Sequence, residues 1–183
     1  LWMHPNGDSI LVFHNRQHNF STSHPRGGVY AFNLSQDTLL WSLEGYNPAR
    51  GLTPYVYDNK IYSEGNGVGC LDAFTGEVLW EKRFGIPNEN TGSGSVLVAD
   101  DKLIVKTVEH TIYALDPNTG AQIWRTEDAG STPTPIQYYN GAVYYSSIGK
   151  GKIFGVDVQT GEVILEERSP NRSDFPAATF TWS

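Results

Sequence analysis

Residues 70–80 read CLDAFTGEVLW, and residues 114–124 repeat the pattern as ALDPNTGAQIW. Two weaker copies flank this pair, AFNLSQDTLLW at residues 31–41 and GVDVQTGEVIL at residues 155–165. The acidic or amide position advances through Asn33, Asp72, Asp116 and Asp157, in steps of 39, 44 and 41 residues. A period in this range with strand-like content is typical of a β-propeller made of four-stranded blades. The repeat therefore predicts an all-β fold.

Each repeat divides into four short runs of β-forming residues separated by Asp, Asn and Gly turns, which predicts antiparallel blades with strands A to D. The predicted blades span approximately residues 1–43, 53–83, 94–126 and 133–167, and residues 176–183 align with the first strand of a further blade. We therefore expect one partial propeller domain over residues 1–183, with about four blades plus one extra strand. Because the pattern opens and closes within a repeat, we also expect a longer polypeptide.

Composition narrows the classes of partner. The formal net charge is −7, the pI is about 5.1, and no run of Lys and Arg occurs, so neither nucleic acid nor an anionic membrane is expected as a partner. No apolar stretch approaches the roughly 18 residues of a membrane-spanning helix. Cys70 is the single cysteine, which excludes a disulfide within the chain. It occupies the small-residue position of the repeat and is expected to be a buried strand residue.

The repeated residues have structural roles. Gly in the Thr-Gly pair permits a positive φ in a tight turn, and the preceding Asp can accept hydrogen bonds from backbone N–H groups of that turn. The Trp can lie against the neighbouring blade, where its indole N–H needs one acceptor. The first copy has lost this Gly, and the fourth carries Leu165 in place of Trp, which predicts a weaker outer seam there. The predicted structural residues are Asn33, Trp41, Asp72, Gly76, Trp80, Asp116, Gly120, Trp124, Asp157 and Gly161.

The pattern small-x-Asp-x-x-Thr-Gly-x-x-Leu/Ile-Trp resembles the tryptophan-docking repeat of the PQQ-type (quinoprotein-type) β-propellers. That superfamily includes quinoprotein alcohol dehydrogenases and the non-enzymatic scaffold lipoprotein of the outer-membrane barrel assembly machinery. The copies at residues 70–80 and 114–124 match well, and the outer two are degenerate. The resemblance implies a ring of seven or eight blades. Either further blades lie outside this chain, or two copies complete each other as a dimer.

Strand directions place the D–A and B–C loops at one end of the blades, the end that carries ligands in related propellers. His14, His18 and His24 in the first B–C loop are weak candidates for metal ligands, because no carboxylate in that loop orients the imidazoles. We interpret this loop as solvated or in contact with a partner, and no metal is predicted. Glu109 and His110 are adjacent on a strand end and point in opposite directions, so an acid–base pair is not favoured.

The resemblance also supplies an alternative function. A quinoprotein dehydrogenase that oxidises alcohols or sugars needs PQQ, calcium ligands, a catalytic Asp and a disulfide between adjacent cysteines, and the last cannot form with Cys70 alone. The leading hypothesis is a non-catalytic, exported scaffold, in the periplasm or at the cell surface, with no cofactor. It binds a protein or glycan through the end of the D–A and B–C loops. Aromatic residues near these loops, such as Tyr46, Tyr55, Tyr138 and Tyr139, are candidates for the contact surface, and packing within the blades is the alternative for most of them.

Overall fold

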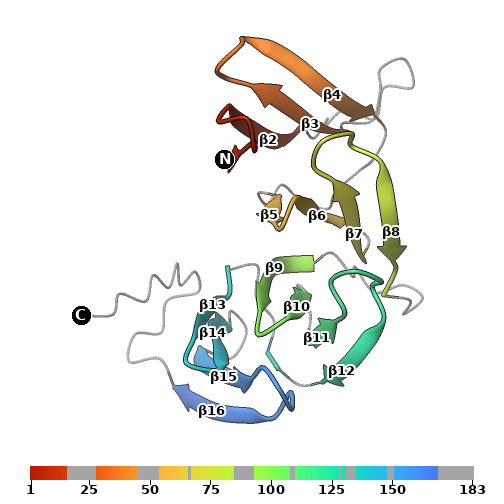
Figure 1. Ribbon diagram of the computed structural model, residues 1–183. Coiled ribbons are helices and arrows are strands. Elements are labelled where there is room, and N and C mark those ends of the chain that lie inside the picture. The colour runs from red at the N-terminus through yellow and green to blue at the C-terminus, as the bar shows by residue number, and fades with distance from the viewer. Residues whose placement is uncertain are drawn as a thin grey trace, which may run out of the picture. The chain divides into compact units, whose positions relative to one another are not determined.

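The computed structural model describes residues 1–15, 28–44, 54–65, 67–84, 93–107, 110–127, 129–130, 135–147 and 151–168. Over these ranges the chain is all β, with no helix and four separate four-stranded sheets (Figure 1). Every neighbouring pair of strands within a sheet is antiparallel. The predicted fold class, a partial propeller of four-stranded blades, is confirmed.

The chain divides into two compact units, Leu1–Arg83 and Phe84–Ser183. Blade 1 of the first unit contains Trp2–Met3 (β1), Ser9–Asn15 (β2), Gly28–Asn33 (β3) and Thr38–Glu44 (β4). Blade 2 contains Tyr55–Tyr57 (β5), Lys60–Gly65 (β6), Gly67–Asp72 (β7) and Val78–Lys82 (β8). Blade 3 of the second unit contains Ser93–Ala99 (β9), Lys102–Thr107 (β10), Ile112–Leu115 (β11) and Gln122–Thr126 (β12). Blade 4 contains Gln137–Tyr139 (β13), Ala142–Ser147 (β14), Lys152–Asp157 (β15) and Val163–Arg168 (β16). The proposed strand at residues 176–183 lies outside the described residues.

Two-residue turns join strands A and B in blades 2, 3 and 4. Asp100 and Asp101 both have positive φ, 46° and 59°, and the flanking Ala99 and Lys102 are paired. Consecutive positive φ values are the signature of the type I′ hairpin turn, whose twist matches that of the flanking strands. Asp100 and Asp101 therefore form the hairpin turn between strands A and B of blade 3.

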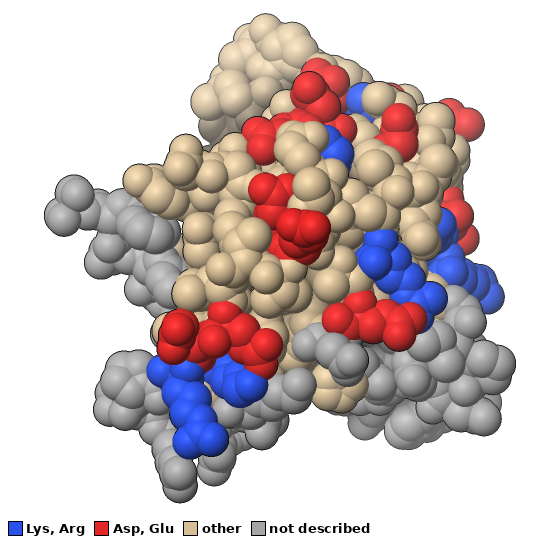
Figure 2. All heavy atoms as spheres, turned by 90° about the horizontal axis from the view of Figure 1, so that it is seen from below, with Lys and Arg blue, Asp and Glu red and all other residues tan. Residues whose placement is uncertain are grey.

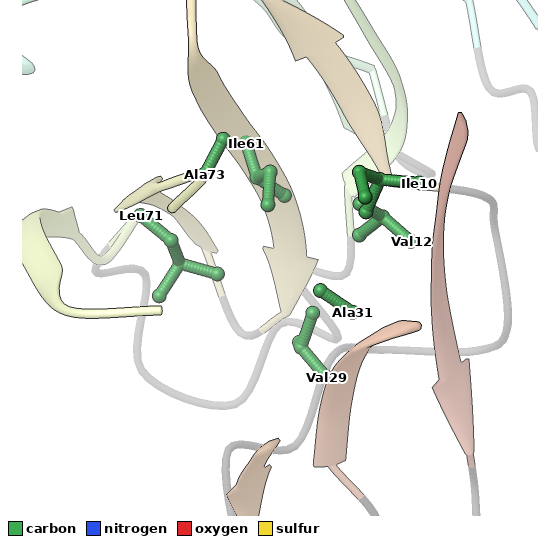
Figure 3. Packing of buried hydrophobic residues seen from close by; sticks show 7 residues of the cluster. All are labelled: Ile10, Val12, Val29, Ala31, Ile61, Leu71 and Ala73. Atoms are coloured by element: carbon green, nitrogen blue, oxygen red, sulfur yellow. The ribbon is translucent and has the colours of Figure 1, made fainter. Parts of the chain in front are cut away.

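The core of the first unit lies between blades 1 and 2. Figure 3 shows side chains from β2 and β3 meeting side chains from β6, β7 and the turn after β7. The cluster consists of Ile10, Val12, Val29, Ala31, Ile61, Leu71 and Ala73. Each large aliphatic member contributes about 1.5–3 kcal/mol by leaving water. Alternate residues of β2 therefore face blade 2, which directs Leu11 and Phe13 to the opposite face of blade 1.

Each blade carries a bulge between strands C and D, immediately before the Trp position. Ala31 pairs with Trp41 while Phe32 pairs with Leu39, so Leu40 is the extra residue. The same register shift leaves Leu79, Ile123 and Ile164 as extra residues in the other blades. All four of these side chains are exposed. The bulge thus re-aims the chain so that the Trp position faces the small residue of strand C.

The described residues contain no helix long and apolar enough to cross a bilayer.

We predict that Asp101→Gly raises the free energy of unfolding by roughly 0.5 kcal/mol, because Gly adopts the left-handed conformation without a Cβ clash. Asp101→Val should lower it by about 1 kcal/mol or more, because a β-branched residue is strained there. Urea unfolding of the two variants checks both values. Equal stability of the two would contradict the assigned turn strain.

Candidate functional site

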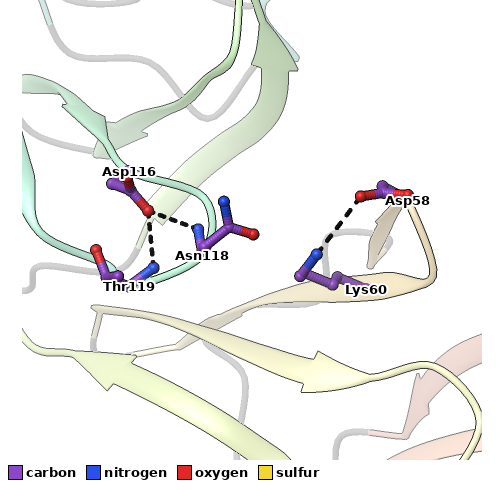
Figure 4. Close-up of polar contacts among 5 residues, drawn as sticks. All are labelled: Asp58, Lys60, Asp116, Asn118 and Thr119. Atoms are coloured by element: carbon purple, nitrogen blue, oxygen red, sulfur yellow. Dashed lines mark hydrogen bonds and ion pairs between the residues drawn. The ribbon is translucent and has the colours of Figure 1, made fainter.

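The turn between strands C and D is built around one carboxylate in blades 2, 3 and 4. In blade 3, Asp116 Oδ1 accepts hydrogen bonds from the backbone N–H groups of Asn118 at 2.8 Å and Thr119 at 2.9 Å (Figure 4). Gly120 follows in the left-handed conformation, with φ 70°, and its N–H donates to the Asp116 carbonyl. The backbone N–H of Asn118 is the main cause of the lowered pKa of Asp116. This carboxylate is therefore occupied in stabilising its own turn.

Blades 2 and 4 reproduce this geometry. Asp72 Oδ1 accepts from the N–H groups of Phe74 and Thr75 at 2.8 and 2.9 Å. Asp157 Oδ1 accepts from those of Gln159 and Thr160 at 2.9 and 2.8 Å, and the Thr160 N–H is the main cause of its lowered pKa.

The indole of one blade docks on the turn of the next blade in the same unit. Trp41 Nε1 donates to the Ala73 carbonyl at 3.0 Å, and Trp124 Nε1 donates to the Val158 carbonyl at 3.0 Å. The acceptor is in each case the residue that follows the turn Asp. A Cβ built on Gly76 would lie 2.5 Å from the Trp41 ring, so the ring rests directly on the glycine backbone. Gly76 is therefore required for two reasons: it adopts the positive φ of the turn, and it has no Cβ to block the indole ring.

Blade 1 forms the same turn with different residues. Asn33 Oδ1 accepts from the N–H groups of Ser35 at 2.9 Å and Gln36 at 3.0 Å. Asp8 accepts from the Asn33 amide at 2.8 Å, which is the main cause of the lowered pKa of Asp8. The glycine position is filled by Asp37 with φ 54°. The degenerate first copy thus keeps the turn but places a Cβ where the other turns have none.

Strand B carries a polar residue at one fixed register position in every blade. His14, Glu64, Lys106 and Ser146 pair with Val29, Val68, Ile112 and Ile153 of strand C, respectively. This position lies at the end of strand B that enters the B–C loop. This recurrence was not predicted from the sequence, although a Lys after three apolar residues of β10 was a signal for it.

Lys106 is the most unusual member of this set. Its side chain is fully buried, its Nζ donates to the Thr107 carbonyl at 2.8 Å, and it lies 5.5 Å from the ring centroid of Tyr145 in blade 4. Burial lowers the pKa of Lys106 to about 7. The Tyr145 hydroxyl donates to the Ala129 carbonyl at 2.8 Å, and burial raises its pKa. Lys106 therefore belongs to the packed seam between blades 3 and 4.

His14 is the only described member of the predicted histidine cluster, because His18 and His24 lie outside the described residues. Its Nε2 is buried without a hydrogen-bond partner among the described residues, and burial lowers the pKa of His14 to about 4. No group of three or more His, Cys, Asp or Glu side chains that could hold a metal occurs in the described ranges. Glu109 is also undescribed, and His110 is exposed in the B–C loop of blade 3.

Two of the four tyrosines predicted near the D–A and B–C loops lie at the other end of their blade. Tyr138 and Tyr139 end strand A beside the Asn140-Gly141 turn, which is the end opposite the D–A and B–C loops. The Tyr138 hydroxyl donates to Asp100 Oδ1 at 2.7 Å, across the A–B turns of blades 3 and 4. Tyr55 begins strand A at the loop end, and Tyr46 lies outside the described residues. The Asn140-Gly141 turn directly after Tyr138 and Tyr139 already marks the A–B end in the sequence.

Cys70 is fully buried on β7, opposite Trp80, and burial raises the pKa of its thiol to about 11. The described cations of the surface lie close to carboxylates rather than in a basic patch on the face that Figure 2 shows. Arg125 pairs with Glu127 at 2.5 Å, Lys60 pairs with Asp58 at 3.6 Å, and Lys152 pairs with Glu166. The charges of these three cations are therefore offset by nearby carboxylates.

Comparisons with known proteins agree with this architecture. A family described as outer membrane protein assembly factor BamB matches residues 25–174. Two proteins of that name are similar to this chain. The protein from Burkholderia pseudomallei is 25% identical over 79% of this chain, and the protein from Shewanella oneidensis is 24% identical over 68% of it. The chain spans only 40% and 33% of their respective lengths.

Solved structures give the same fold. The BamB structure from Moraxella catarrhalis is similar with a TM-score of 0.64 and 19% identity, over 86% of this chain and 49% of that one. A europium-containing methanol dehydrogenase is similar with a TM-score of 0.68 and 17% identity, over 91% of this chain and 46% of that one. At these identities the structures establish the propeller fold and leave the function open.

We predict that Gly161→Ala destabilises the protein far more than Gly141→Ala. Both glycines have left-handed φ values, 77° and 80°, but only a Cβ at Gly161 would meet the Trp124 ring, at 2.7 Å. Gly141→Ala should cost about 1 kcal/mol from strain alone, and Gly161→Ala about 1–3 kcal/mol more from overpacking. Chemical unfolding measures the difference, and equal losses would show that the indole does not rest on the turn.

We predict that His14 makes stability depend on pH between about 4 and 6.5. The pKa is about 4 when folded and about 6.5 when unfolded, so the unfolded chain binds more protons in this window. Stability should therefore fall as pH drops from 6.5 to 4. His14→Phe should remove this component, as seen in urea midpoints at pH 4.5 and 7.5. If the pH dependence of stability is unchanged in the variant, a group other than His14 causes it.

Proposed function

Because the chain belongs to the family of the outer membrane protein assembly factor BamB, we propose that it is a non-catalytic scaffold that acts outside the cytoplasm, in the periplasm or at the cell surface. The supporting observation is where the repeated polar groups are used. Asp72, Asp116 and Asp157 stabilise their own turns, and Trp41 and Trp124 join neighbouring blades. The repeated Asp and Trp residues thus stabilise the blades and their packing, and the loops remain for recognition.

We propose that the partner is a protein of the outer membrane assembly pathway, bound at the end of the D–A and B–C loops. His110 is exposed at this end, in the B–C loop of blade 3. Binding residues concentrate on loops that a rigid framework positions.

A quinoprotein dehydrogenase is the second candidate, favoured by the structural similarity to methanol dehydrogenase. The described residues do not supply its chemistry. Cys70 is a single buried thiol, and no cluster of metal-ligating side chains occurs in the described ranges. Under this candidate the protein would bind PQQ and calcium, and the described residues identify no ligands for either.

We predict that a photo-crosslinking amino acid at His110 captures an outer-membrane assembly protein in cells, whereas one at Tyr139 does not. Both side chains are exposed, but Tyr139 lies at the opposite, A–B end of its blade. Mass spectrometry of the adducts identifies the partner. Equal capture at both sites, or no capture at His110, contradicts the proposed binding face. Calcium-dependent stabilisation by added PQQ would favour the dehydrogenase instead.

A further inference from the structure

We propose that Asn140, in the A–B turn of blade 4, is a site of spontaneous deamidation, at which water converts the side-chain amide to aspartate and isoaspartate. The described ranges contain two complete Asn-Gly pairs, Asn6-Gly7 and Asn140-Gly141. Both asparagines are exposed, so access to water does not distinguish them. The hydrogen bonds around the two pairs do distinguish them, because they hold the amide of Asn6 and leave that of Asn140 free.

The reaction joins two groups that are adjacent in the chain. The backbone nitrogen of the Gly attacks Cγ of the Asn, the N–H proton passes to the side-chain amide nitrogen, and ammonia leaves as a succinimide ring forms. Water then adds to either carbonyl of the ring and opens it to aspartate or isoaspartate. Gly favours the attack, since it has no Cβ and its backbone rotates freely. The step therefore requires a free Asn amide and a Gly nitrogen that can turn toward it.

Both requirements are met in the turn of blade 4. The side chain of Asn140 makes no hydrogen bond among the described residues. The Gly141 N–H donates to the Tyr138 hydroxyl at 3.3 Å, which is long for an N–H donor. A Cβ built on Gly141 would meet nothing within 4 Å, so the space around this residue is open. Neither reacting group is therefore held firmly in place.

The hairpin that carries this turn is short. Strand β13 lies at the edge of its sheet and pairs with β14 through three residues, Gln137, Tyr138 and Tyr139. The corresponding strand of blade 3, β9, pairs with β10 through six residues of β10. A short edge strand with few contacts opens locally at a low cost in free energy. Such opening lets Asn140 and Gly141 leave their left-handed conformations, with φ 46° and 80°, and adopt the geometry of attack.

The turn of blade 1 holds its Asn-Gly pair in place. Asn6 Nδ2 donates to Asp8 Oδ2 at 2.9 Å, and Asn6 Oδ1 accepts from the Asp8 N–H at 3.0 Å and lies 2.7 Å from His4 Nδ1. The Gly7 N–H donates to the His4 carbonyl at 2.8 Å. Asp8 is itself fixed, because it accepts from the Asn33 amide at 2.8 Å. Attack at Asn6 would have to break several of these bonds at once.

Deamidation at Asn140 would also change the contact between blades 3 and 4. The Tyr138 hydroxyl donates to Asp100 Oδ1 at 2.7 Å and accepts from the Gly141 N–H. A carboxylate at position 140 adds a negative charge to a turn that is already joined to Asp100. Isoaspartate also lengthens the backbone of a two-residue turn by one methylene, which is incompatible with type I′ geometry. We therefore expect the modified chain to unfold at a lower urea concentration than the unmodified chain.

The test is incubation of the folded 183-residue chain in H₂¹⁸O at pH 8.5, followed by tryptic digestion in ordinary water and mass spectrometry. Deamidation during the incubation incorporates ¹⁸O, whereas deamidation during digestion does not. Labelling at Asn140 should be at least about tenfold faster than labelling at Asn6, because only the turn of blade 4 opens without breaking side-chain bonds of its Asn. Methylation by an isoaspartyl methyltransferase should then detect isoaspartate in the peptide spanning residues 126–150.

The same chain unfolded in urea is the matched control. Both Asn-Gly pairs should then be labelled at similar rates, because the hydrogen bonds that separate them are lost. Asp8→Ala provides a second control, since it removes the acceptor of the Asn6 amide. In this variant labelling at Asn6 should accelerate in the folded chain, while labelling at Asn140 stays unchanged. Circular dichroism shows whether the variant remains folded.

Three results would each overturn the proposal. They are equal labelling of Asn6 and Asn140 in the folded wild type, faster labelling of Asn6, and labelling of Asn140 that appears only after unfolding.

Discussion

The packing of adjacent blades depends on one contact, an indole N–H of one sheet bonded to a turn carbonyl of the next. Trp41 reaches Ala73 and Trp124 reaches Val158, both at 3.0 Å. The contact requires three adjustments at once. A carboxylate shapes the turn, a glycine lets the ring approach, and a bulge in strand D aims the Trp. Together these three features fix both the spacing and the direction of the neighbouring sheet.

The fold could be predicted from the sequence because its determinants are local and recur. The turn Asp and the Gly with positive φ are separated by a fixed spacing, and type I′ turns need only two residues of suitable conformation. The bulge could not be predicted, because it depends on pairing between strands C and D rather than on residue type. The hydrogen-bond acceptor of Trp41 could also not be predicted from the sequence, because every backbone carbonyl of the next blade has the same chemistry.

The candidate site was less predictable than the fold. The histidine-rich loop was considered as a metal site because of its three histidines. Its one described histidine, His14, is a partly buried strand residue. The fully buried Lys106 went unnoticed because a Lys on a strand normally marks a solvated face. Tyr138 and Tyr139 were assigned to the wrong end of their blade, although the Asn140-Gly141 turn that follows them marks the A–B end in the sequence.

The order of the docking contacts also affects how the chain is made. Trp41 finds its acceptor 32 residues later in the sequence, and Trp124 finds its own 34 residues later. During synthesis each sheet can form its ladder at once, but its indole stays in water until the next C–D turn has left the ribosome. Maturation of each sheet therefore lags synthesis by about one repeat, and a chain stalled within a repeat presents an undocked aromatic ring.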